Sequence, residues 1–214
     1  MIDENIMRAI YSYCEEVTEP QGEILYKLFR ETHLKTMAPR MASGPIQGRL
    51  LSLICKLLRP KTILEIGTFT GYATICMAEG LAPDGHITTI EINPELNYLS
   101  DKYFHLAGIR DQVTSMIGNA REIIPQLDRK FDLVFIDAKK KDYALYYEMI
   151  IDKVNQGGLI LADNVLWDGK VIDGSKDATS ESLRNFNKKV KEDKRVSSLL
   201  LPLRDGLMIL RKVG

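Results

Sequence analysis

Residues 62–74 read TILEIGTFTGYAT, a short apolar run followed by two glycines and a helical pattern. The run at 62–66 has the length and the β-branched content of a buried strand. Gly67 and Gly71 let the chain turn tightly and let backbone amides approach a ligand at the start of the next helix. This stretch predicts the first strand, turn and helix of an α/β fold.

The same alternation continues along the rest of the chain. Further apolar runs lie at 86–92, 113–117, 131–137 and 158–163, and helical patterns lie near 71–80, 94–107, 119–127 and 142–153. This spacing predicts right-handed crossovers and a parallel sheet with helices on both faces. We therefore expect an α/β, Rossmann-like doubly wound sheet.

The two ends of the chain depart from this alternation. Helical patterns lie at 4–17, 21–35, 45–58 and 179–193, and two more strand candidates lie at 196–203 and 206–212. Because only Arg204 and Asp205 separate these last strands, they predict an antiparallel hairpin at the end of the sheet. No linker divides the chain. We expect one domain over 1–214, with an N-terminal helical extension (1–58) and a cofactor-binding core (59–214).

The composition excludes several classes of protein. The chain has 214 residues, 45% of them apolar, which supplies a core and excludes a disordered chain. Lys and Arg total 29, as do Asp and Glu, so the chain has no net positive charge that would favour nucleic-acid binding. Three cysteines are too few for a disulfide framework. Without a secretory signal or a long apolar run, we expect a cytoplasmic protein that does not bind membranes.

A nucleoside ligand is predicted where the first two strands end. Ligands of such sheets collect beyond the carboxyl ends of the strands. Glu91 ends the second strand, 24 residues after Gly67, and its carboxylate can accept from both hydroxyls of a ribose. The alternative is a tight turn beside a solvated glutamate. The three-glycine spacing of nicotinamide-binding proteins is absent, so a dehydrogenase is the weakest hypothesis.

A cluster of oxygen ligands is predicted where the fourth and fifth strands end. Asp137 ends one strand, and Asp163 and Asn164 end the next. Two carboxylates and an amide oxygen suit Mg²⁺ or a similar hard cation, whereas zinc would favour His or Cys. Aspartates at strand ends also cap helices. Spacing alone leaves both interpretations open.

The runs LEIGTFTGYAT, IEINPE, FIDAKKKDYALYY and ILADNVLWDG together resemble class I S-adenosylmethionine-dependent O-methyltransferases. The resemblance is to the cation-dependent group of caffeoyl-CoA and catechol O-methyltransferases and their bacterial relatives. It extends from residue 41 to residue 210, and DNVLWDG and FIDA-x-K are its most specific parts. It implies methyl transfer from S-adenosylmethionine to a hydroxyl of a catechol-like or caffeoyl-type small molecule, a hydroxylated aromatic substrate.

The resemblance also implies roles for individual residues. The implied cofactor-binding residues are Ser43, Glu65, Gly67, Thr68, Gly71, Ala73, Glu91, Asn119, Ala120 and Asp137. The implied metal ligands are Asp137, Asp163 and Asn164, holding Mg²⁺ or alternatively Mn²⁺ or Ca²⁺. Two positions depart from the family pattern, since Ala73 stands where many relatives have serine and Asn119 where many have aspartate.

Lys140 matches the catalytic lysine of the catechol enzymes, so the resemblance implies that it acts in catalysis together with Asp137. It would work as a general base with a lowered pKa, or as a fixed positive partner of the phenolate. The alternative is that Lys140 is one of three solvated lysines, with Lys139 and Lys141 on either side.

Other functions remain open at this stage. The same chemistry could act on a hydroxylated uridine of tRNA, because the lysine run and Arg40 would suit phosphates. A cofactor-binding module without catalysis is a further alternative, although such a module needs no metal ligands. We expect a homodimer, with the N-terminal helices covering either the acceptor site or a subunit interface.

Overall fold

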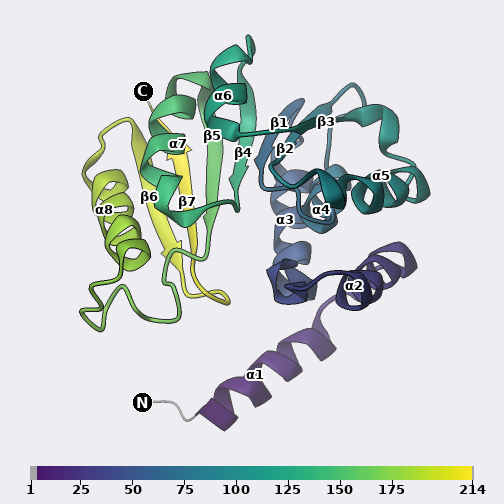
Figure 1. Cartoon of the computed structure of the whole chain (residues 1–214), viewed down its shortest axis with the longest axis horizontal. Helices are drawn as coiled ribbons and strands as arrows, with labels where there is room; N and C mark the ends of the chain where they lie inside the picture. The colour runs from purple at the N-terminus through teal and green to yellow at the C-terminus, as the bar shows by residue number, and fades with distance from the viewer. Residues whose placement is uncertain (1–3, 214) are drawn as a thin grey trace.

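A seven-stranded sheet forms the centre of the computed structural model, which describes residues 4–213 (Figure 1). Its strands are β1 (Thr62–Ile66), β2 (His86–Glu91), β3 (Val113–Ile117), β4 (Phe131–Ile136), β5 (Val154–Asp163), β6 (Val196–Leu201) and β7 (Leu207–Lys212). They lie in the order β3-β2-β1-β4-β5-β7-β6. Strands β1 to β5 pair in parallel, and β7 is antiparallel to both of its neighbours. The expected Rossmann-like class is confirmed. Residues 1–3 and 214, the ends of the expected domain, lie outside the described residues.

Helices cover both faces of the sheet (Figure 1). They are α1 (Glu4–Val17), α2 (Glu23–Lys35), α3 (Gly44–Leu58), α4 (Tyr72–Ala78), α5 (Asn97–Leu106), α6 (Ala120–Ile123), α7 (Tyr143–Ile150) and α8 (Ala178–Glu192). Because side chains alternate along a strand, Val134 and Ile136 pack with α7 and α8 while Leu133 and Phe135 pack on the other face, with α3 and α4. This double coverage explains why the central strands carry apolar residues on both faces of the sheet.

The N-terminal helices differ in how they attach to this core. Leu25 and Leu28 of α2 and Leu51 of α3 are buried in the same apolar cluster as side chains of α4 and α5. Helix α1 extends away from the sheet in Figure 1, and Tyr13 and Val17 on it are exposed. None of the helices between residues 4 and 213 is long and apolar enough to cross a membrane. The expected homodimer stays a prediction.

Several element boundaries differ from the expected ones, most clearly those of β5 and α6. Strand β5 begins at Val154, four residues before its apolar run, because a register shift opposite Phe131 and Leu133 lets it continue pairing with β4. The helix expected at 119–127 is α6 followed by a 3₁₀ turn at Ile124–Gln126. Proline in that turn lacks the backbone N–H that an α-helix needs.

The C-terminal hairpin also differs in detail. Its strands end at Leu201 and resume at Leu207, so the connection spans residues 202–206 rather than two residues. Strand β7 lies between β5 and β6, which leaves β6 at the edge of the sheet. The antiparallel pairing itself was predicted correctly. This arrangement brings the hairpin loop to the end of β5, beside the candidate site.

Candidate active site

The glycine loop after β1 lies directly against the chain that leaves β4. The Gly67 and Thr68 amides donate to the Ile90 carbonyl of β2, at 2.9 and 3.3 Å. Gly67 has a φ of +102°, and a Cβ atom at this position would lie 2.1 Å from the Asp137 carbonyl oxygen. Only glycine fits such a backbone and such an approach. The loop and the candidate metal ligands therefore form one continuous site.

Glu91 ties this loop to the end of β2. Its Oε2 accepts from the Phe69 amide at 2.7 Å, and its Oε1 accepts from the Asn93 amide at 2.8 Å. Each carboxylate oxygen has a second lone pair, so both can still accept a further hydrogen bond. This geometry is compatible with the expected contact to a ribose.

Glu65 lies behind the loop rather than at its surface. The carboxylate is fully buried, and its Oε2 accepts from Thr74 Oγ1 at 2.5 Å and from Thr89 Oγ1 at 2.6 Å. Its Oε1 is buried without a hydrogen-bond partner among the described residues. Burial raises the pKa of Glu65 to about 8. A direct contact between Glu65 and a cofactor stays a prediction.

The other expected cofactor residues fall into two groups. Thr68, Gly71 and Ala73 lie on or just after the glycine loop, and Thr68 Oγ1 is 2.5 Å from Thr89 Oγ1. The remaining three lie at the starts of two helices: Ser43 before α3, and Asn119 and Ala120 at α6. The Asn119 side chain accepts from the Arg121 amide and caps its own helix. Its role toward a cofactor stays a prediction.

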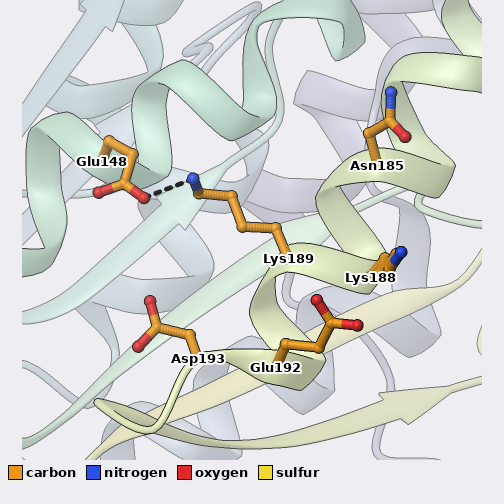
Figure 2. A pocket seen from close by; sticks show the side chains of 6 residues that line it. All are labelled: Glu148, Asn185, Lys188, Lys189, Glu192 and Asp193. Atoms are coloured by element: carbon orange, nitrogen blue, oxygen red, sulfur yellow. Dashed lines mark ion pairs between the residues drawn. The ribbon is translucent and has the colours of Figure 1, made fainter.

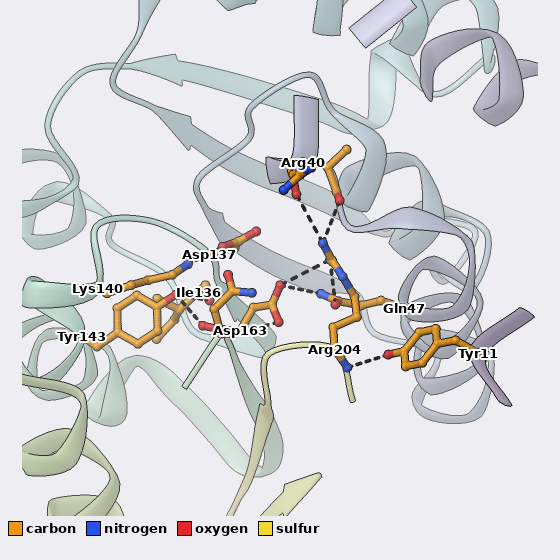
Figure 3. Close-up of polar contacts among 11 residues, drawn as sticks. Tyr11, Arg40, Gln47, Ile136, Asp137, Lys140, Tyr143, Asp163 and Arg204 are labelled. Carbon is orange, nitrogen blue, oxygen red and sulfur yellow. Dashed lines mark hydrogen bonds and ion pairs between the residues drawn. The ribbon is translucent and has the colours of Figure 1, made fainter. Parts of the chain in front are cut away.

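Asp137 and Asp163 come from neighbouring strand ends, as the sequence predicts. Ile136 of β4 pairs with Ala162 of β5, so the aspartates that follow lie side by side (Figure 3). Asp163 is 1% exposed, and burial together with the charge of Asp137 raises the pKa of its carboxyl group. Asn164 follows in a left-handed conformation, and its backbone N–H donates to Asp163 Oδ1 at 2.9 Å.

Lys140 differs from its two lysine neighbours. Its Nζ lies 2.6 Å from Asp137 Oδ1 and 5.3 Å from the centre of the Tyr143 ring, with 11% of its side chain exposed. Burial opposes the charged form, but Asp137 and Tyr143 outweigh it and raise the pKa of Lys140. Lys139 and Lys141 are exposed. The interpretation of the run as three equivalent solvated lysines is therefore wrong for Lys140.

A pocket adjoins the buried carboxylate of Asp163. It has a volume of about 350 Å³ and is lined by α1, α2, residues 39–47 and Arg204 of the hairpin loop. A larger hollow of about 390 Å³ lies on α7 and α8 (Figure 2). Its lining is charged, with Lys189 paired to Glu148 at 2.6 Å, and it contains none of the residues singled out by the sequence. The pocket beside Asp163, rather than the hollow on α7 and α8, is therefore the candidate acceptor site.

Comparison with known proteins identifies the family of this chain. Residues 15–213 match the model of the O-methyltransferase family. The chain belongs to this family. A catechol O-methyltransferase from Niastella koreensis is 36% identical over 170 residues, 77% of each chain. A caffeoyl-CoA O-methyltransferase from Eucalyptus gunnii is 33% identical over 218 residues, 96% of this chain and 88% of its own.

A solved structure agrees with this assignment. The O-methyltransferase TomG from Streptomyces achromogenes, in complex with S-adenosylmethionine, is 29% identical with a TM-score of 0.91, covering 100% of both chains. The protein is thus an S-adenosylmethionine-dependent O-methyltransferase, as the resemblance implied. The hypotheses of a non-catalytic module and of a dehydrogenase are set aside.

Sequence reasoning missed three residues of this O-methyltransferase site. Tyr143 OH lies 3.2 Å from the Ile136 carbonyl and 2.9 Å from the Asp163 carbonyl, which joins the ends of β4 and β5. Gln47 and Arg204 contact each other and Asp163 (Figure 3). A local signal could have pointed to Tyr143, because it follows Lys140 by three residues within the run FIDAKKKDYALYY. Gln47 and Arg204 are separated by 157 positions, and no pattern in the sequence links them.

Replacing Glu91 by Ala is expected to weaken S-adenosylmethionine binding about tenfold or more, because hydrogen bonds to a charged group contribute ~1.5–3 kcal/mol. Calorimetric titration of the cofactor measures the effect. Glu95→Ala is the matched control, since Glu95 is exposed on the following turn. Equal affinities of the Glu91 variant and the wild type would remove Glu91 from the cofactor site.

Proposed function

We propose that this O-methyltransferase requires a divalent cation and methylates one of two adjacent ring hydroxyls on a catechol-like or caffeoyl-type acceptor. The observation that carries the proposal is the meeting of Asp137, Asp163 and Asn164 at the ends of β4 and β5, directly against the glycine loop. Relatives named catechol and caffeoyl-CoA O-methyltransferases support the choice of acceptor.

The residues present fit a hard cation. Within residues 4–213 no group of three or more His, Cys, Asp or Glu side chains is arranged to hold a metal ion. Asp137, Asp163 and the side-chain amide of Asn164 would instead supply oxygen ligands. Such ligands suit Mg²⁺, and also Mn²⁺ or Ca²⁺. Asp163 Oδ1 and Oδ2 each accept a hydrogen bond and each retain a free lone pair. Lys140 Nζ lies 2.6 Å from Asp137 Oδ1, whereas the Arg204 guanidinium lies farther from Asp163, at 3.9 Å.

The chemistry follows from these positions. A cation held there would bind adjacent hydroxyl oxygens and favour the ionised acceptor over a neutral phenol of pKa ~10. Lys140 would place a fixed positive charge beside the reacting oxygen, a role that its 2.6 Å ion pair with Asp137 supports. The Gly67–Gly71 loop would hold the sulfonium methyl for in-line attack. Positioning and charge stabilisation would supply most of the rate gain.

The acceptor would occupy the pocket beside Asp163. Its volume of about 350 Å³ is at the lower end of the ~300–1,000 Å³ usual for small-molecule sites and suits one ring with a short side chain. Phe29 and Tyr11 offer aromatic surface within it. Gln47 and Arg204 line the pocket and also lie against Asp163, so an acceptor held there would have its hydroxyls near the candidate metal ligands.

Methyl transfer from labelled S-adenosylmethionine to a panel of acceptors tests the proposal. The panel pairs 1,2-dihydroxybenzene with 1,3-dihydroxybenzene, which has the same groups but cannot place both oxygens on one cation. A caffeoyl thioester and undermodified tRNA complete it. We expect transfer to the adjacent diol and to the thioester, and little to the 1,3 isomer. Equal transfer to both isomers, or transfer to tRNA alone, would contradict the proposed acceptor class.

A further inference from the structure

We propose that Gln47 is a positioning residue for Asp163, and that Arg204 fixes the orientation of the Gln47 amide. The loop of the C-terminal hairpin would thereby set the geometry of the candidate metal site. This inference rests on the proposed cation dependence and adds to it two residues from outside the ligand set. The three side chains and their contacts are drawn in Figure 3.

The first contact is between Gln47 and the buried carboxylate. Gln47 lies on α3 and is fully buried, and its Nε2 donates to Asp163 Oδ2 at 2.7 Å. The Asn164 amide donates to the other oxygen, Oδ1, at 2.9 Å. Each oxygen of Asp163 thus has one donor, and together the two donors fix the rotation of the carboxylate. Burial keeps water from replacing the Gln47 bond.

The second contact decides which way the Gln47 amide faces. Arg204 Nη1 donates to Gln47 Oε1 at 3.0 Å. A guanidinium group can only donate, so the oxygen of the amide must face Arg204 and its NH₂ group must face Asp163. A flipped amide would place NH₂ against the guanidinium and an oxygen against the carboxylate, losing both hydrogen bonds.

Arg204 is itself held firmly. Its Nη2 donates to the Ala42 carbonyl at 3.1 Å and to the Arg40 carbonyl at 3.4 Å. Its own backbone amide donates to Tyr11 Oη at 2.6 Å. The guanidinium lies 3.9 Å from Asp163 Oδ2, beyond hydrogen-bond distance, so its main link to the carboxylate runs through Gln47. Arg204 thus joins the hairpin loop to the segment before α3 through its side chain and to α1 through its backbone amide.

Such outer contacts matter because a metal ligand must be held in its productive orientation. Removing a group that orients a ligand typically lowers metal affinity or activity by ~10–100-fold. The expected signature of Gln47 and Arg204 is therefore a larger loss of cation affinity than of cofactor affinity, because their hydrogen bonds lead to Asp163 and not to residues 67–71.

The test uses calorimetric titration of Mn²⁺ into metal-stripped protein, for the wild type, Gln47→Leu, Arg204→Ala and the double variant. We expect Gln47→Leu to lower the affinity for Mn²⁺ roughly tenfold. Arg204→Ala should act in the same direction, because it frees the amide to flip. The double variant should bind no more weakly than Gln47→Leu, since both changes break one series of contacts. A single cooperative thermal transition and retained binding of S-adenosylmethionine confirm that each variant is folded. The unfolding temperature is expected to fall, because each substitution removes hydrogen bonds.

Arg40→Ala is the matched control, because Arg40 lines the same pocket and contributes to this network only through its backbone carbonyl. It should keep the wild-type affinity for Mn²⁺. Equal losses in Arg40→Ala and Arg204→Ala would reduce Arg204 to a general electrostatic effect and overturn its assigned role. Wild-type affinity in Gln47→Leu would overturn the positioning role alone. A wild type that binds no Mn²⁺ would instead overturn the proposed cation dependence, and this inference with it.

Discussion

Replacing Asp163 by Ala is expected to abolish methyl transfer while the chain remains folded. Asp163 is the buried member of the candidate ligand set, and it holds the contacts to Gln47 and to the Asn164 amide. Without its carboxylate, one ligand and much of the negative charge that would attract a cation are lost. Transfer of labelled methyl groups to 1,2-dihydroxybenzene measures the loss.

The fold should survive this substitution for an electrostatic reason. Because burial and Asp137 raise the pKa of Asp163, its contribution to stability is present at low pH and is lost as the pH rises through the raised pKa. At neutral pH the charged form of this carboxyl group therefore costs stability in the metal-free protein, and its removal offsets the loss of the hydrogen bond from Gln47. We expect similar unfolding temperatures for the metal-free variant and wild type at pH 7.

Asp168→Asn is the matched control for Asp163→Ala. Asp168 follows Asp163 by five residues and is exposed, and asparagine tolerates its left-handed backbone, at a φ of +51°. This control should retain wild-type turnover. Full turnover in Asp163→Ala would remove Asp163 from the catalytic site, and loss of turnover in both variants would point to the loop instead.

Replacing Lys140 by Ala is expected to lower kcat by roughly 10²-fold or more, the scale typical of removing a group that stabilises charge in the transition state. The change removes the positive charge beside the acceptor oxygen and leaves Asp137 without its 2.6 Å ion pair. Steady-state kinetics at saturating S-adenosylmethionine measure the effect, and calorimetry should show that cofactor affinity changes little.

Lys139→Ala and Lys141→Ala are the controls for Lys140, because both side chains are exposed neighbours of the same charge. Their losses should be much milder. Equal, modest losses in all three variants would mean that the run acts only as an electrostatic guide. That result would favour an acceptor that carries phosphate, such as tRNA, over a small catechol.

Local patterns were enough to predict much of the fold. The run at 62–66 and the glycines after it correspond to β1 and its loop, because apolar runs and glycine turns are properties of neighbouring residues. The start of β5 could not be predicted, because Val154 joins the sheet through a register shift with β4. The position of β7 between β5 and β6 depends equally on distant pairing.

The residues of the candidate site likewise divide into those that local patterns predict and those that depend on distant contacts. Asp137 and Asp163 could be placed together from sequence, because the ends of neighbouring parallel strands meet at one edge of a sheet. The ion pair of Lys140 with Asp137 is also local, three residues apart. Gln47 and Arg204 carry no such signal. They meet only because the hairpin loop and the start of α3 both pack at the end of β5.

The most direct test of the proposed mechanism is methyl transfer to 1,2-dihydroxybenzene by enzyme stripped of metal by exhaustive chelation, followed by addition of Mg²⁺. The stripped enzyme should bind S-adenosylmethionine and yet transfer no methyl groups, because Asp137, Asp163 and Asn164 would have no cation to hold. Addition of Mg²⁺ should restore turnover in the wild type and leave Asp163→Ala inactive. Full turnover by the stripped enzyme would contradict the account.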